Sequence, residues 1–250
     1  MAWVVPLYDR EQVNIAGRTR INDTASADAK ESALGIVNNW RSAHSFPLNC
    51  FQVTLRDRAH SINPGALIAQ RLKRLVAIEA KLRRFSAMKL SQMQDIGGCR
   101  AILTNVGQVE RLANLYRRRS RQDARRAEER AARRTPNGNT RAGHQLVHED
   151  DYIATPKGDG YRGIHLIYRY HTGTKAYRAF NDLKVEIQLR SRLQHAWATA
   201  VETVDVFTGQ ALKSDQGQKD GRGSLPSWEV RSLLKSTVHR SPMCPRTEPN

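Results

Sequence analysis

The sequence predicts an α/β protein, because stretches with helical spacing of apolar residues alternate with short stretches of β-favouring composition. Two strands are the clearest, at residues 162–170 and 183–190, and the second alternates apolar with polar positions from Val185 to Arg190. The chain has 250 residues, of which 39% are hydrophobic, and this is enough for a hydrophobic core. We therefore expect one large domain or one domain with appendages.

Helical spacing recurs along the rest of the chain. A helix from about Ala66 to Phe85 is expected to turn an apolar stripe toward the core, with Arg71, Lys73 and Lys81 along its edge. These cations could contact a triphosphate together, or they could form a solvated basic face. The other expected helices cover residues 29–45, 50–61, 109–134 and 192–207, and a further short strand is expected at residues 99–103.

Residues 151–165 combine turn chemistry with an aromatic and an imidazole side chain. Pro156 and two glycines favour a sharp turn, and a strand is expected to begin near Tyr161. Period-two geometry would place Tyr161 and His165 on one face of this strand, close to Lys157. Such a surface suits a nucleobase and its phosphates, although an aromatic core residue and a hydrogen-bonded histidine are the ordinary alternative.

The charge of the chain points to polyanionic partners. Forty-one Lys and Arg residues against twenty-four Asp and Glu residues give a formal net charge of +17, which favours nucleotides, RNA or DNA. The arginines are concentrated in residues 117–141. No apolar run is long enough for a membrane span, and the N-terminus lacks the features of a secretion signal, so we expect a cytoplasmic protein with no membrane partner. The spacing of Cys50, Cys99 and Cys244 indicates neither a disulfide framework nor a zinc site.

Two carboxylates stand out as candidates for chemistry. Asp95 precedes two glycines between an expected helix and an expected strand, where it could hold a magnesium ion or simply cap a turn. Glu186 is expected on the polar face of its strand, where it needs a partner or a metal. A salt bridge to Arg190 is the alternative for Glu186. Two acidic residues, a basic segment and a Gly-rich turn are together typical of magnesium-dependent transfer on a nucleotide.

In this order the motifs resemble those of the RelA/SpoT synthetase family over roughly residues 60–210. The matching segments are Arg71-x-Lys73 with Lys81, Asp95-Ile96-Gly97-Gly98-Cys99-Arg100, Asp151-Tyr152-Ile153 with Pro156-Lys157, Gly160-Tyr161-Arg162-Gly163-Ile164-His165, and Glu186-Ile187-Gln188-Leu189-Arg190 with His195. The third and fourth segments together form one motif, and four separated motifs are far more specific than any one alone. The chain resembles a short form that has the synthetase region and lacks a hydrolase domain.

The resemblance implies a nucleotidyltransferase-like fold, with a mixed β-sheet flanked by helices. It also implies transfer of the β,γ-pyrophosphate of ATP to a ribose 3′-hydroxyl, with AMP as the leaving group and Mg²⁺ as the cofactor. Asp95 and Glu186 would be catalytic and hold the metal. ATP would bind at Arg71, Lys73, Lys81 and Arg100, and the acceptor would bind at Lys157, Tyr161, His165, Gln188 and Arg190, with Tyr161 stacked on guanine.

The acceptor and the partners stay open at this point. GTP or GDP is expected from the family as a whole, which would make the chain a synthetase of (p)ppGpp-type alarmones. Residues 194–202 resemble a toxic branch, some of whose members modify the 3′ end of tRNA; homo-oligomerisation and a neutralising antitoxin are further expectations for such a chain. The alternative of another class is a non-catalytic RNA-binding protein. We expect a helical region at 1–60, a synthetase domain at 61–213 with an Arg-rich insertion at about 117–143, and a weakly ordered tail at 214–250.

Overall fold

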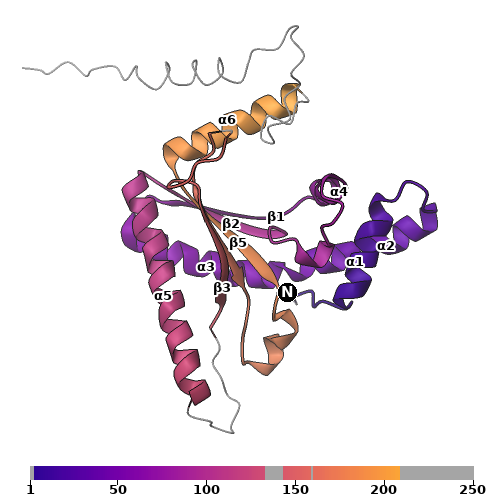
Figure 1. The fold of residues 1–250 in the computed structure, drawn as a ribbon, viewed down its shortest axis with the longest axis horizontal. Coiled ribbons are helices and arrows are strands. Elements are labelled where there is room, and N and C mark those ends of the chain that lie inside the picture. The colour runs from indigo at the N-terminus through magenta and orange to yellow at the C-terminus, as the bar shows by residue number, and fades with distance from the viewer. Residues whose placement is uncertain (1–2, 133–142, 159, 209–250) are drawn as a thin grey trace, which may run out of the picture. The chain divides into compact units, whose positions relative to one another are not determined.

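The computed structural model describes residues 3–132, 143–158 and 160–208, and it contains a five-stranded mixed sheet (Figure 1). Strand order is β1-β2-β5-β4-β3. β2 and β5 are parallel, whereas the other three neighbouring pairs are antiparallel. The strands are β1 (Leu67–Leu72), β2 (Gly97–Leu103), β3 (Gln145–Asp151), β4 (Ile164–Arg169) and β5 (Lys184–Ser191). The predicted mixed sheet flanked by helices is therefore confirmed.

Six α-helices and two short 3₁₀ helices are present in the described ranges. They are α1 (Arg10–Ile21), α2 (Ala27–Ala43), α3 (Ser45–Ile62), α4 (Leu75–Arg84), α5 (Val106–Ala132), α6 (Arg192–Thr208), η1 (Leu90–Gln92) and η2 (Lys175–Phe180). α1 was not predicted, and it begins with a capping box in which Asp9 and Gln12 bond each other's backbone. Pro47 lies in the first turn of α3, where a missing N–H is tolerated, so this helix starts earlier than predicted.

The predicted single helix over residues 66–85 is wrong. Residues 67–72 form the edge strand β1, and α4 begins only at Leu75. Pairing with β2 over six residues satisfies the backbone groups on one side of this segment, and four of its six side chains are exposed. An edge strand with little buried surface has no strict period-two pattern, so its apolar residues fit a helical period by coincidence. Arg71, Lys73 and Lys81 consequently lie on a strand, a connection and a helix.

The two faces of the sheet differ in character. Val185, Ile187 and Leu189 are fully buried on one face. On the same face the ring of Tyr168 contacts Phe51 of α3, with ring centroids 5.5 Å apart, and Tyr116 of α5, with centroids 5.7 Å apart. α3 and α5 therefore cover the apolar face, and the polar residues of β5 point to the opposite side.

The chain divides into two compact units, one of residues 1–157 with 161–196 and the other of residues 158–160 with 197–250. The first unit holds the whole sheet. In the second unit, Gly160 has a positive φ of 82°, and a side chain at this position would meet the ring of Trp197. The predicted tail at 214–250 and the end of the Arg-rich insertion, residues 133–142, lie outside the described residues.

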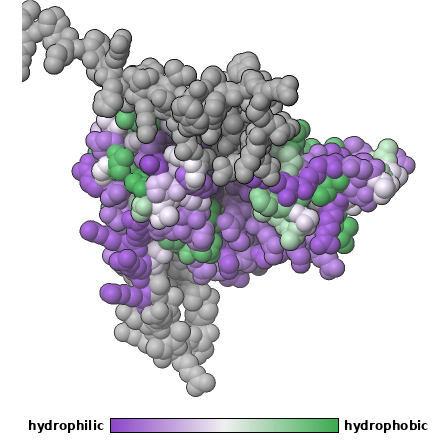
Figure 2. All heavy atoms as spheres, turned by 45° about the horizontal axis from the view of Figure 1, so that its top comes forward, coloured by the Kyte–Doolittle hydropathy of each residue, from purple (hydrophilic) through white to green (hydrophobic). Residues whose placement is uncertain are grey.

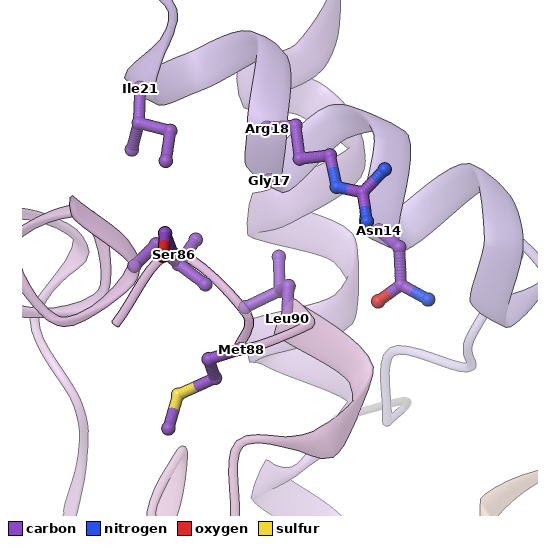
Figure 3. A pocket seen from close by; sticks show the side chains of 8 residues that line it. Asn14, Gly17, Arg18, Ile21, Ser86, Met88 and Leu90 are labelled. Atoms are coloured by element: carbon purple, nitrogen blue, oxygen red, sulfur yellow. The ribbon is translucent and has the colours of Figure 1, made fainter. Parts of the chain in front are cut away.

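Helix α1 packs against α4 and η1 through a close approach at Gly17. A Cβ added there would lie 2.9 Å from Cβ of Leu90, so only glycine lets α1 come this near to η1. A small hollow remains between α1 and the α4–η1 segment (Figure 3). Its lining residues are Asn14, Gly17, Arg18, Ile21, Leu82, Ser86, Met88 and Leu90. With one charged side chain and no carboxylate in the lining, it is not the predicted site.

Much of the described surface is hydrophilic. Hydrophilic residues predominate on the described part of the face that Figure 2 shows. Within the described ranges no helix is both long and apolar enough to span a membrane. Cys50 and Cys99 are free cysteines, and Cys244 lies outside the described residues.

Candidate active site

The polar face of the sheet brings together side chains from three neighbouring strands. In the β2–β5 register Arg100 lies opposite Gln188, and in the β4–β5 register Gln188 lies opposite His165. These residues therefore form one row across the sheet, with Glu186 in the adjacent row beside Gly98. The Arg100 guanidinium donates from Nε and Nη2 to Oε1 of Gln188 at 3.1 and 3.0 Å.

Five of the predicted residues close a ring of hydrogen bonds. Gln188 Nε2 donates to Glu186 Oε2 at 2.7 Å, and Arg190 Nη2 donates to Gln188 Oε1 at 3.1 Å. Arg190 Nε donates to the Tyr161 hydroxyl at 2.9 Å, and this hydroxyl lies 2.6 Å from His165 Nε2. His165 Nδ1 lies 2.9 Å from Glu186 Oε1 and completes the ring. Because Arg190 can only donate, the phenolic hydrogen is left for His165 Nε2, and His165 then carries its hydrogen on Nδ1, toward Glu186.

This ring determines the charge of Glu186. Burial raises the pKa of the Glu186 carboxyl, but its interaction with His165 and the hydrogen bond from Gln188 bring it below its ordinary value. Glu186 is therefore ionised at neutral pH although its side chain is only 15% exposed. Its partners are His165 and Gln188, whereas Arg190 bonds Tyr161 and Gln188, so the alternative of a Glu186–Arg190 salt bridge does not hold.

Asp95 forms a second charged centre, immediately before β2. Lys73 Nζ and Lys81 Nζ lie 2.8 and 2.9 Å from its two carboxylate oxygens. Burial raises the pKa of Asp95, and the two ammonium groups more than offset this, so the pKa lies below its ordinary value. Lys73 and Lys81 thus meet at Asp95 and not, as was predicted, along the edge of one helix. They meet because the backbone N–H of Lys73 bonds the carbonyl of Ile96 at 2.8 Å, beside Asp95.

Arg71 and Arg100 complete this side of the site. Arg71 pairs with Gly98 on β2, and Arg100 pairs with Ala69 on β1. The two arginines therefore share the polar face as diagonal neighbours on adjacent strands.

A turn after β3 supplies the opposite side. Asp151 accepts hydrogen bonds from the N–H groups of Ile153 and Ala154, both at 3.0 Å, and this shapes the turn that carries Tyr152 and Lys157. The Lys157 ammonium lies 4.2 Å from the centre of the Tyr152 ring and 5.4 Å from that of Tyr161. Strand β4 begins at Ile164, so Tyr161 precedes it and reaches His165 from the turn.

Two contributors to the site were missed by sequence reasoning. Tyr152 sits edge-on to both Tyr161 and His165, at centroid distances of 5.7 and 5.3 Å. Arg117 of α5 donates to Glu149 at 2.8 Å and to Asp151 at 3.0 Å, and so holds the turn against the helix. Tyr152 could have been found from the sequence, because it is an aromatic residue directly after Asp151. Arg117 could not be separated by sequence from the arginines that follow it.

The two carboxylates fit a magnesium ion that also binds phosphate. Asp95 immediately precedes the start of β2, and Gly98 of β2 lies beside Glu186 in the β2–β5 register, so both carboxylates belong to the same end of these two strands. Mg²⁺ prefers oxygen ligands and commonly takes one or two carboxylates together with substrate phosphates. Within the described ranges no group of three or more His, Cys, Asp or Glu residues could hold a metal. A protein-only cage is therefore not formed by these residues, and a shared, phosphate-bound ion suits this pair.

Comparisons with known proteins identify a family and similar folds. Residues 70–204 match the family model described as the region found in RelA / SpoT proteins. Comparison with curated proteins gives no match. Three solved structures are similar in fold, each at 20% sequence identity or less.

The first is small alarmone synthetase 1 from Bacillus subtilis bound to its product pppGpp, with 20% identity and a TM-score of 0.53 over 77% of this chain and 86% of the other. Small alarmone synthetase 2 from the same organism has 19% identity and a TM-score of 0.56, over 81% and 92%. A GTP pyrophosphokinase family protein from Streptococcus pneumoniae has 18% identity and a TM-score of 0.52, over 77% and 80%.

Proposed function

Because the chain belongs to the RelA/SpoT family, we propose that it transfers the β,γ-pyrophosphate of ATP to the ribose 3′-hydroxyl of GTP or GDP. One observation carries this proposal. An ionised, half-buried Glu186 is held by His165 and Gln188 on a sheet face whose neighbouring carboxylate, Asp95, lies between two lysines. A carboxylate of this kind can accept a hydroxyl proton, and the lysines suit a phosphate chain.

The donor side would be the surface formed by β1, α4 and the start of β2. Lys73 and Lys81 would contact the phosphates of ATP. Both ammonium groups lie beside Asp95, which would hold the Mg²⁺ that binds these phosphates. Arg71 and Arg100 lie on the same face of β1 and β2. Planar guanidinium groups stack on aromatic bases and bind phosphate, so these two residues suit the adenine and the triphosphate.

The chemistry would need one proton acceptor and one stabilised leaving group. The acceptor's 3′-oxygen attacks the β-phosphorus of ATP, and the bond from this phosphorus to the oxygen shared with the α-phosphorus breaks. The electron pair of that bond leaves with AMP, and the hydroxyl proton passes to Glu186. His165 and Gln188 hold the carboxylate in place during the transfer. When bound, Mg²⁺ at Asp95 and Glu186 would supply charge neutralisation on the phosphates.

Lys157, Tyr161, His165, Gln188 and Arg190 would form the acceptor side. All five lie at or beside the hydrogen-bonded ring, with Gln188 and Arg190 on β5, His165 on β4, and Lys157 and Tyr161 in the segment before β4. Cationic and amide groups here suit the 5′-phosphates and ribose of a nucleotide.

One observation also favours RNA as an acceptor. Arg118, Arg121 and Arg125 are exposed on α5, and a helix that carries them could lie along RNA phosphates. If RNA binds there, replacement of all three by Gln should flatten the slope of log affinity against log salt by about 2–3 for tRNA, since each phosphate contact contributes about 0.7–0.9. ATP binding should not change. An unchanged slope would contradict docking of RNA on this helix.

The decisive experiment combines the purified chain with γ-labelled ATP, Mg²⁺ and either GTP, GDP or bulk tRNA. We expect label in the guanosine nucleotide with equimolar release of AMP, and no label transfer in a Glu186→Gln variant, which is nearly isosteric. Label in tRNA alone would replace the guanosine nucleotide as acceptor. RNA binding without any release of AMP would instead favour a non-catalytic RNA-binding protein.

A further inference from the structure

We propose that Arg20 and Arg41 are positioning residues, through which the N-terminal helices α1 and α2 hold the two lysines of the donor side in place. This inference rests on the proposed function, because Lys73 and Lys81 are the residues that would contact the phosphates of ATP. Both arginines lie outside residues 70–204, the part of the chain that the family model matches.

Arg41 bonds the main chain of Lys73 directly. From the last turn of α2, its Nε donates to the carbonyl oxygen of Lys73 at 2.7 Å. On the other side of the same residue, the N–H of Lys73 donates to the carbonyl oxygen of Ile96 at 2.8 Å. The main chain of Lys73 is therefore held from two directions, between α2 and the segment that leads into β2.

The position of this main chain determines where the Lys73 ammonium group can reach. Lys73 lies after the end of β1 at Leu72 and before the start of α4 at Leu75. From there its Nζ lies 2.8 Å from a carboxylate oxygen of Asp95. Misplacement of a positioned group by about 1 Å can cost about 100-fold in rate, so the loss of a bond that holds this main chain should affect the donor side.

The end of α2 that carries Arg41 is itself packed against the start of β2. A Cβ added at Gly97 would lie 3.5 Å from Cβ of His44 and 3.7 Å from its carbonyl oxygen. His44 is buried, and burial lowers its pKa to about 4, so the ring is neutral at pH 7 and its Nδ1 donates to the carbonyl of Trp40 at 2.8 Å. Arg41 therefore extends from a buried corner that contacts the strand directly after Asp95.

Arg20 holds α4, the helix that carries Lys81. Its Nε and Nη2 lie 2.8 and 2.7 Å from Oε1 of Glu79 on α4, and its Nη1 donates to the carbonyl of Lys30 on α2 at 3.2 Å. Both members of the Arg20–Glu79 pair are partly buried, so solvent screens this pair less than an exposed one. One side chain thus joins α1, α2 and α4 two residues before Lys81.

The experiment measures nucleotide binding separately from turnover. Calorimetric titration in Mg²⁺ gives the Kd of a non-hydrolysable ATP analogue and the Kd of GDP for the parent, Arg41→Met, Arg41→Lys and Arg20→Met. Arg58→Met is the matched control, because Arg58 is also a partly buried helical arginine, but its guanidinium lies over the Tyr116 ring, 4.3 Å from the centre.

The expected losses concern the ATP analogue alone. Arg41→Met should weaken its binding about 10- to 100-fold, as expected for one lost hydrogen bond from a charged donor. Arg20→Met should weaken it about 2- to 5-fold, because a partly exposed ion pair contributes less. Arg41→Lys keeps a cationic donor and should recover most of the affinity. The Kd of GDP should stay at the parent value in all these variants, and Arg58→Met should change neither Kd.

A double-mutant cycle decides whether Arg41 acts through Lys73. Since Lys73→Met removes the ammonium group that Arg41 is inferred to position, adding Arg41→Met to it should weaken binding of the analogue by less than about twofold more. Full additivity of the two losses would overturn the inference. An unchanged Kd in Arg41→Met, equal losses for the analogue and for GDP, or equal losses in Arg41→Met and Arg58→Met would also overturn it.

Two further outcomes separate this inference from the proposed function. If circular dichroism shows that Arg41→Met does not fold, Arg41→Lys and Arg20→Met carry the same comparison of the analogue with GDP. Binding of the analogue without transfer of pyrophosphate would refute the proposed reaction, whereas the Kd values would still decide the role of the two arginines. A parent chain that does not bind the analogue would overturn both.

Discussion

The Tyr161 hydroxyl is the one atom that joins two parts of the hydrogen-bonded ring, so its removal tests the whole network. Tyr161→Phe deletes the acceptor of Arg190 Nε and the partner of His165 Nε2. It leaves the volume of the aromatic side-chain ring unchanged. Arg190 is only 2% exposed, so its Nε–H would remain buried without an acceptor. If Tyr161 only stacked on a base, this substitution would be harmless.

The expected loss follows from the two bonds. A hydrogen bond to a charged group contributes about 1.5–3 kcal/mol and a neutral one about 0.5–1.5 kcal/mol. Arg190 keeps its bond to Gln188, so we place the total loss at about 2–3 kcal/mol, in the lower part of the combined range. For a protein of this size that corresponds to a fall in Tm of about 4–12 °C.

Thermal unfolding followed by circular dichroism measures this directly. Tyr177→Phe is the matched control, because Tyr177 is 41% exposed, stacks on Phe46 and lies outside the ring. We expect the control to stay within about 2 °C of the parent, since surface substitutions usually change stability by less than 0.5 kcal/mol. Equal Tm values for the two variants would refute a stabilising network through the Tyr161 hydroxyl.

Three other perturbations test the packing, the loop tether and the buried carboxylates. Gly17→Ala should lower the free energy of unfolding in urea by about 1–3 kcal/mol, because the added methyl group meets Leu90. Gly35→Ala, at an open helical position, should raise it by about 0.5–1 kcal/mol. Effects of the same sign would contradict the close packing of α1 on η1. Arg117→Ala should weaken GDP binding about 2- to 10-fold through the turn after β3 and leave ATP binding unchanged, and calorimetry that shows equal losses would argue against the tether. The pKa values of Asp95 and Glu186 are lowered in the folded state, so these carboxylates stabilise the fold above about pH 4 and lose this effect as the pH falls through their folded-state pKa values. Asp95→Asn should therefore lose less stability than the parent on acidification. An identical dependence of the unfolding free energy on pH would contradict the ion pairs.

The strand β5 shows why part of the site was predictable. Its alternation is complete, with Val185, Ile187 and Leu189 buried on one face, because both neighbours of β5 pair with it and helices cover that face. Because successive side chains of a strand point to opposite faces, Glu186 must then lie on the polar face of the sheet. The pairing of Glu186 with His165 was not predictable, because it depends on the register between β4 and β5, which no local pattern encodes.

The segment around Arg71 shows the opposite case. β1 is an edge strand that buries little, so no face of it had to be apolar, and a helical period fitted the same residues. Lys73, Lys81 and Asp95 were each singled out as charged candidates, but their convergence was not predicted. It depends on a contact between distant segments, in which the backbone N–H of Lys73 bonds the carbonyl of Ile96, and no local sequence pattern encodes such a contact.

The arginine-rich helix meets the acceptor side through one residue. Arg117 contacts Asp151, and the exposed Arg118, Arg121 and Arg125 follow on the same helix. α5 packs against the apolar face, whereas Glu186 lies on the polar face, so RNA bound along these arginines must pass the β3 edge of the sheet before its 3′ end can reach Glu186. One possibility is that the bound RNA strand extends from α5 around the β3 edge to Glu186. The other is that RNA bound on α5 changes the position of the turn after β3 through the contact between Arg117 and Asp151. A free guanosine nucleotide has no such distance to span, which supports it as the first acceptor to test.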